Sequence, residues 1–198
     1  MHPRDILAMG RGNHPGQRHG PRPIVLSLIA LGAIVGALIV SGCPGGDNEE
    51  VRHATLLGSS EVPPRTTAAT GAVTLTINDA RTRITYREDL VPPFTSNLTG
   101  SHIHVQQPTA NGPIVLHFCT NQTPPVGVLT PQACPTAGGT ITGTLTAADF
   151  IPSAAATALG VNTFADAVAQ ILSGSTGAYA NAHTVTNPSG EVRGQIGP

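Results

Sequence analysis

Apolar and polar residues alternate in short segments from about residue 53 onward, and this pattern predicts β-strands. Val73, Leu75 and Ile77 alternate with threonines, as in a strand that turns one face toward a core. Residues 78–81, Asn-Asp-Ala-Arg, predict a hairpin turn, because Asn and Asp tolerate a left-handed backbone. About eight strand segments are expected: 53–58, 71–77, 82–88, 101–106, 113–118, 140–146, 177–184 and 190–196.

A short helical insertion is expected among these strands, at about 147–173. Thr163 is placed to cap a helix that stops at Gly174, and a further helical turn is expected within 147–159. One face of the capped helix is apolar, formed by Phe164, Val168, Ile171 and Leu172. The predicted fold is therefore mainly β, a sandwich or barrel interrupted by a short helical region.

An uncharged apolar run, residues 24–40, precedes the strands and predicts an N-terminal signal or anchor helix. Its length fits either a secretion signal or a membrane anchor. The sequence that follows, Val40-Ser41-Gly42-Cys43, resembles the bacterial lipobox. In a lipobox, small residues let a peptidase approach the backbone, and the cysteine sulfur is acylated before cleavage. Cys43 is therefore the predicted lipidation site.

The lipobox implies an exported protein held in the bilayer through acylated Cys43, on the extracytoplasmic side of the cell envelope. Pro44 lacks the Asp that often retains lipoproteins in the inner membrane, which favours the outer one. An uncleaved anchor and a soluble secreted form are the alternatives, and translation can start at Met1 or Met9. The expected parts are a lipoprotein signal peptide (1–42), a flexible Gly-rich tether (43–53) and one exported domain (54–198).

Composition and charge narrow the possible partners. Only 11% of the 198 residues are charged and 3% are aromatic, with 23 Gly and 18 Pro, which suits short strands and turns. From Cys43 onward ten carboxylates stand against six arginines, and the sequence contains no lysine. Such an acidic surface does not attract phosphate backbones, so nucleic acid is excluded as the expected partner.

Five parts of the sequence follow the order of the CHRD (chordin) domain pattern, and together they cover nearly all of 54–198. The chain therefore resembles this family, which implies an immunoglobulin-like or dismutase-like β architecture and no generally assigned activity. It departs from the usual pattern at Ser101, at Val105 and at Ala180-Asn181-Ala182. The matching parts are 61–64 (EVPP), 101–104 (SHIH) with 111–113 (NGP), 143–149 (GTLTAAD), 181–184 (NAHT) and 187–195 (NPSGEVRGQ).

Three histidines form a candidate metal site. His102 and His104 lie two residues apart, so a strand projects both imidazoles from the same face. His183 belongs to another strand of the family pattern, and if it crosses nearby, the three rings would suit copper or zinc. The alternative is that these histidines donate hydrogen bonds to backbone carbonyls and hold loops together.

Glu191 and Arg193 alternate on the last predicted strand, so both point away from the Val192 face. Glu191 could accept a hydrogen bond from a metal-binding histidine, or the two side chains could pair. A solvated strand face is the simpler expectation for both residues.

Cys119 and Cys134 remain once Cys43 is assigned to lipid, and in an exported domain they predict a disulfide around a Pro- and Thr-rich loop. His117, beside this loop, could add a metal ligand, although a surface position is the simpler expectation.

Two functions follow from the sequence. The first is a non-catalytic binding or structural module whose ligand is an unknown protein, glycan or small molecule. The second is a copper- or zinc-binding protein of possible redox character that uses His102, His104 and His183. No arrangement typical of a nucleophilic or phosphate-binding enzyme stands out in the sequence, so no catalytic residue is assigned.

Overall fold

A computed structural model describes residue 20, residues 48–124 and residues 126–198. The predicted lipidation site, Cys43, and nearly all of the predicted signal peptide (1–42) lie outside the described residues. In the described part of the chain, no helix is both long and apolar enough to cross a membrane.

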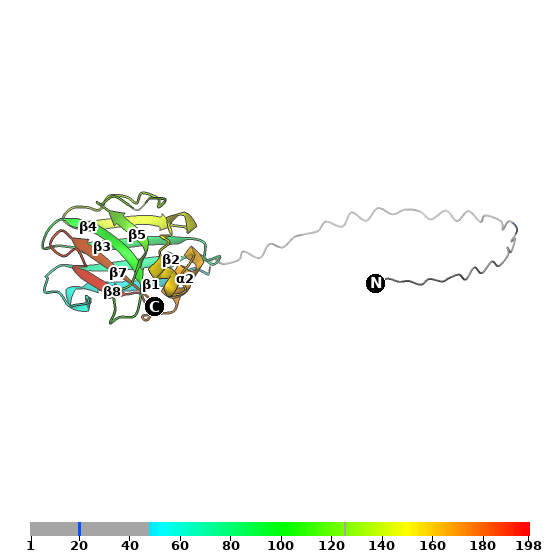
Figure 1. Cartoon of the computed structure of the whole chain (residues 1–198), viewed down its shortest axis with the longest axis horizontal. Helices are drawn as coiled ribbons and strands as arrows, with labels where there is room; N and C mark the ends of the chain where they lie inside the picture. Colours follow the sequence, from blue (N-terminus) through cyan, green and yellow to red (C-terminus); the bar gives the residue numbers. More distant parts are fainter. Residues whose placement is uncertain (1–19, 21–47, 125) are drawn as a thin grey trace, which may run out of the picture. The chain divides into compact units, whose positions relative to one another are not determined.

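Eight antiparallel strands form one sheet that curls into a nearly closed barrel (Figure 1). The strand order is β5-β4-β7-β8-β1-β2-β3-β6, and the two edge strands, β5 and β6, also contact each other. This confirms the mainly β prediction. The strands are β1 (Glu50–Leu57), β2 (Thr70–Ile77), β3 (Ile84–Val91), β4 (Leu98–Val105), β5 (Ile114–Thr120), β6 (Gly139–Leu145), β7 (Ala178–Thr184) and β8 (Val192–Gln195).

β1 begins earlier than the sequence pattern predicted, within the segment 43–53 that was expected to be a tether. Glu50 pairs with Ile77 at the end of β2, and its carboxylate forms ion pairs with Arg52 and Arg81. Glu50 and Arg52 lie on the same side of the strand as the core residues Ala54 and Leu56, and these charged residues keep the segment from reading as a strand in the sequence. The segment left for a tether therefore ends before Glu50.

The hydrophobic core lies on the concave side of the sheet. Val73, Leu75 and Ile77 of β2 are at most 1% exposed, as their alternation with threonines predicts. The hairpin after β2 also forms as predicted: the Asn78 side chain accepts hydrogen bonds from the backbone N–H groups of Thr82 and Arg83. Arg81 has a left-handed backbone with φ of 55°.

The short helices lie mostly in the predicted insertion, and α2 buries its apolar face against the barrel core. Thr163 caps α2, and Asp166 completes a capping box that satisfies backbone N–H groups at the helix start. The helical elements are η1 (Gly58–Ser60), η2 (Ala147–Asp149), α1 (Ala154–Ala158) and α2 (Phe164–Leu172).

Candidate metal centre

A row of polar side chains crosses four strands on the face of the sheet that points away from the hydrophobic core. His102 of β4 is paired with His117 of β5 and with Asn181 of β7, and Asn181 is paired with Arg193 of β8. Directly paired residues in antiparallel strands project to the same side of the sheet. The alternate residues of β7, such as Ala180 and Ala182, belong to the hydrophobic core, so this row faces outward.

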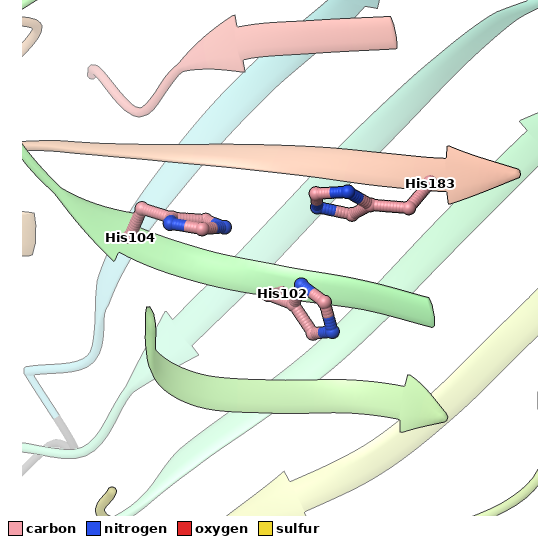
Figure 2. A group of neighbouring side chains, drawn as sticks. All are labelled: His102, His104 and His183. Atoms are coloured by element: carbon pink, nitrogen blue, oxygen red, sulfur yellow. The ribbon is translucent and has the colours of Figure 1, made fainter. Parts of the chain in front are cut away.

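Loops cover this outward face, so the histidines on it are not on the surface. His102, His104 and His183 are 8%, 6% and 9% exposed, respectively. Each offers a ring nitrogen, and these three ligand atoms all lie within 4.8 Å of one another. Figure 2 shows the His104 and His183 rings turned toward each other, with His102 beside the space between them. The structure therefore brings together the three histidines that the sequence predicted.

Backbone carbonyls fix the protonation of two of the rings. The Nδ1–H of His104 donates to the Gly112 carbonyl at 2.8 Å, and the Nδ1–H of His183 donates to the Pro188 carbonyl at 3.0 Å. A neutral imidazole has one N–H, so the Nε2 atom of His104 is left with a free lone pair, whereas the Nε2 atom of His183 already has a partner in the Asn181 Oδ1 at 2.9 Å. The Nε2 of His104 is buried and has no hydrogen-bond partner, and the same is true of the Nδ1 of His102.

Burial keeps these imidazoles neutral. It lowers the pKa of His104 to about 3 and the pKa of His102 well below its usual range, with the neighbouring histidines adding to the effect at His102. Burial also lowers the pKa of His183, although its hydrogen bond to the Pro188 carbonyl acts in the opposite direction. Three neutral imidazoles whose ring nitrogens converge are the donor set that divalent zinc and copper accept.

Tyr179 supports His104 from the neighbouring strand. The two rings stack with centroids 4.7 Å apart and planes 4° apart, and the Arg193 guanidinium lies 3.4 Å from the centre of the Tyr179 ring. Gly112 connects this pair, because its carbonyl accepts from His104 while its N–H donates to the Tyr179 hydroxyl. The ring of His104 is therefore held on its face and at one nitrogen.

Among the residues that the structure describes, Glu191 forms no hydrogen bond with a histidine, so the geometry does not support the suggested role of orienting one. Its carboxylate accepts hydrogen bonds from the hydroxyl groups of Thr67, Thr95 and Thr184. β8 begins only at Val192, so Glu191 belongs to the preceding loop and turns toward other loops. Burial raises its pKa, but these hydrogen bonds outweigh burial and lower the pKa to about 2.

The expected solvated face and the possible Glu191–Arg193 pair are also absent. Both residues are buried, at 0% and 1% exposure. Arg193 instead donates to the carbonyls of Gln107 and Ala110 and to the Asn111 side chain, which fixes the loop that follows β4. The loops that cover the sheet remove these side chains from water, and strand alternation alone does not reveal that cover.

Glu61 is the acidic residue that connects to the histidine group. Its carboxylate, 3% exposed, accepts from the Asn181 Nδ2 at 3.5 Å, and the Asn181 Oδ1 lies 2.9 Å from the Nε2 of His183. Glu61 begins the first of the five family segments, but nothing in the sequence links it to a histidine. Only the folded chain places it next to Asn181.

His117 and the two cysteines are the remaining residues to which the sequence assigned a possible role. The His117 ring is half-buried rather than at the surface, and its centroid lies 4.6 Å from that of His102. Cys119 and Cys134 form the predicted disulfide, with their Cα atoms 5.0 Å apart.

The model of the CHRD domain family matches residues 52–196, a range that holds all three histidines and the polar row around them. Comparisons with curated proteins and with solved structures give no match. The match agrees with the five sequence segments that suggested the same family. The chain therefore belongs to the CHRD domain family.

Proposed function

We propose that this CHRD domain is a non-catalytic metal-binding module that holds one copper or zinc ion through His102, His104 and His183. The observation that carries the proposal is the convergence of three buried ring nitrogens within 4.8 Å of one another. A metal ion would thus be the molecule bound by the binding module that the sequence predicted, and no catalytic step is assigned to the domain.

Histidines that served only to hold loops would use their ring nitrogens for hydrogen bonds. His183 does so with both nitrogens, through Pro188 and Asn181, and His104 with one, through Gly112, but the Nε2 of His104 and the Nδ1 of His102 have no partner. An unsatisfied buried polar atom costs about 1–3 kcal/mol. A metal ion would give these lone pairs a partner, and the two carbonyls would orient the ligands from outside, as is common for metal-bound histidine.

We further propose that acylated Cys43 anchors the domain in the bilayer on the extracytoplasmic side of the envelope. The support is the lipobox-like sequence 40–43, together with β1 starting at Glu50, which leaves only a short connection to the membrane surface. A protein or glycan partner at that surface is compatible with the acidic domain, and nucleic acid is not.

Isothermal titration of residues 44–198 with Zn(II) and Cu(II), after chelator treatment, tests the metal proposal. This range lies within a compact unit of the chain. We expect stoichiometric binding tighter than about 100 μM, which corresponds to roughly 5.5 kcal/mol. Replacing His102, His104 or His183 by Ala should abolish binding.

His53→Ala is the matched control, because His53 lies on the outer side of β1 and bonds to the Thr74 hydroxyl. It should bind like the wild type. If no binding is detected, or if all four variants bind alike, the three histidines have a structural role only.

A further inference from the structure

A hollow of about 240 Å³ opens beside the histidine group at the β4–β5 side of the sheet. His102 and His117 line it together with Thr120 at the end of β5 and with residues of the loop that follows, among them Gln122, Thr123 and Pro124. Gln122 and Thr123 are exposed, whereas His102 is buried. The hollow therefore leads from the surface to one of the three proposed metal ligands.

The other two ligands lie under loops. The backbone carbonyl of Gly112 contacts His104, and that of Pro188 contacts His183. Tyr179 also stacks on the His104 ring. A cation that approached from the His104 or His183 side would have to displace these groups. A cation that entered through the hollow at His102 would displace none of these groups.

His117 stands along this path. It is the direct cross-strand partner of His102, and the two rings meet edge to face with centroids 4.6 Å apart. The Nδ1 of His117 is buried and has no hydrogen-bond partner. The group of three convergent ligand atoms does not include His117. The side chain thus offers an unused nitrogen one ring away from the site without belonging to it.

We propose that this hollow is the route by which the metal ion enters and leaves, and that His117 is a transient ligand on that route. The inference rests on the metal-binding function proposed above. A hydrated cation would exchange one water for the His117 nitrogen, pass to His102, and then lose further waters to His104 and His183. No bond other than metal–water and metal–nitrogen coordination forms or breaks.

A transient ligand affects rates and leaves the equilibrium unchanged. It stabilises a state between free and bound metal, so its removal slows association and dissociation by the same factor. A permanent fourth ligand would behave differently, because its removal would mainly weaken the equilibrium affinity. The ratio of rate effect to affinity effect therefore separates the two roles.

Stopped-flow mixing of the chain from residue 44 with Cu(II), followed by the absorption of the copper–imidazole complex, tests the route. A competing chelator gives the dissociation rate. For His117→Ala we expect both rate constants to fall at least about tenfold, equivalent to roughly 1.4 kcal/mol, with an affinity within about threefold of wild type. His53→Ala should leave both rates unchanged.

A second variant tests the hollow without changing an imidazole. Thr123→Trp places a large side chain at the exposed end, and it should also slow entry and exit while leaving the affinity unchanged. Circular dichroism would confirm that each variant is folded. Unchanged rates in both variants would overturn the route, and an affinity loss above about tenfold in His117→Ala would make His117 a permanent ligand instead. If the wild type binds no copper or zinc, the proposed function itself fails.

Discussion

Single residues decide whether the imidazoles of this domain reach one another. Gly100 lies opposite His183 in the β4–β7 register and leaves room for the neighbouring His102 ring. A Cβ at position 100 would lie 2.7 Å from the His102 Nε2 and 3.1 Å from its Cε1. Both atoms belong to a side chain, so the ring must move while the strand can stay in place.

Gly100→Ala is therefore expected to weaken metal binding at least tenfold, about 1.4 kcal/mol, with a smaller effect on folding stability. Isothermal titration and chemical denaturation of the metal-free protein would measure the two effects. Gly197→Ala is the matched control, because its nearest neighbour would be a Ser175 atom at 3.8 Å. Unchanged affinity in Gly100→Ala would show that the position of the His102 ring does not matter for binding.

Glu88 of β3 gives a second prediction at this scale. It is fully buried, its Oε1 accepts from the Ser101 hydroxyl at 2.5 Å, and its Oε2 has no hydrogen-bond partner. Burial raises its pKa to about 8. Because the folded-state pKa lies above the unfolded-state value, the folded chain binds the proton more tightly. Stability should then fall as pH rises from about 4.5 to about 8.

Glu88→Gln should remove that decline and make the metal-free protein more stable above pH 8, by a few kcal/mol. Gln can still accept from the Ser101 hydroxyl. Urea denaturation at several pH values between 5 and 9 would measure the slope. Glu49→Gln, at an exposed position, should keep the wild-type slope. A slope that persists in Glu88→Gln would assign the proton to another group.

At the level of strands and helices, the sequence predicts what each element does by itself. Alternation of apolar and polar residues predicts the buried face of β2 and the shared face of His102 and His104. A capping residue and a helical spacing predict α2. Each of these signals is local in the sequence. The neighbours of a strand do not follow from its own sequence. The pairing of His102 with His117 and the approach of Glu61 to Asn181 depend on strand order and on loops distant in the sequence. The hydrogen-bond partners of Glu191 could not be predicted for the same reason.

The Cys119–Cys134 disulfide joins β5 to the segment before β6, across a sequence separation of 15. Hydrogen bonds in the same place, such as that from the Thr120 N–H to the Gln132 carbonyl, hold the loop without it. We therefore expect the Cys119→Ser/Cys134→Ser variant to fold but to lose roughly 3 kcal/mol of stability in the loop-entropy model.

Denaturation of the oxidised wild type and of the double variant would measure this loss. Reduced wild type should behave like the variant, which is the internal control for the two substitutions. Because His117 lies on β5 close to Cys119, metal affinity should be measured on the same samples. No loss of stability would mean that the unfolded chain gains little freedom when the bridge is removed.

At the scale of the whole molecule, the domain has two interiors of different chemistry. The concave side of the barrel is apolar apart from the buried pair Glu88 and Ser101, and the outward side of β5, β4, β7 and β8 carries histidines, Asn181 and Arg193 under a cover of loops. The apolar core stabilises the fold, and the polar layer holds the proposed site. A CHRD domain built this way can present a metal site at a membrane surface only if the chain is anchored, which depends on residues outside the described barrel.

The anchoring proposal predicts the behaviour of the whole chain in a bacterial cell. Cys43→Ser removes the sulfur that receives the diacylglyceryl group, so the precursor should stay unprocessed and unacylated. Several acyl chains, at about 0.8 kcal/mol per buried CH₂, give stable attachment, whereas one chain would not. Mass spectrometry of the mature N-terminus and partition into detergent would measure both effects. Ser41→Ala exchanges one small residue for another and should be processed normally. A wild-type chain whose mature N-terminus is unmodified and lies elsewhere than Cys43 would contradict the lipid anchor, while leaving the histidine site of the domain unaffected.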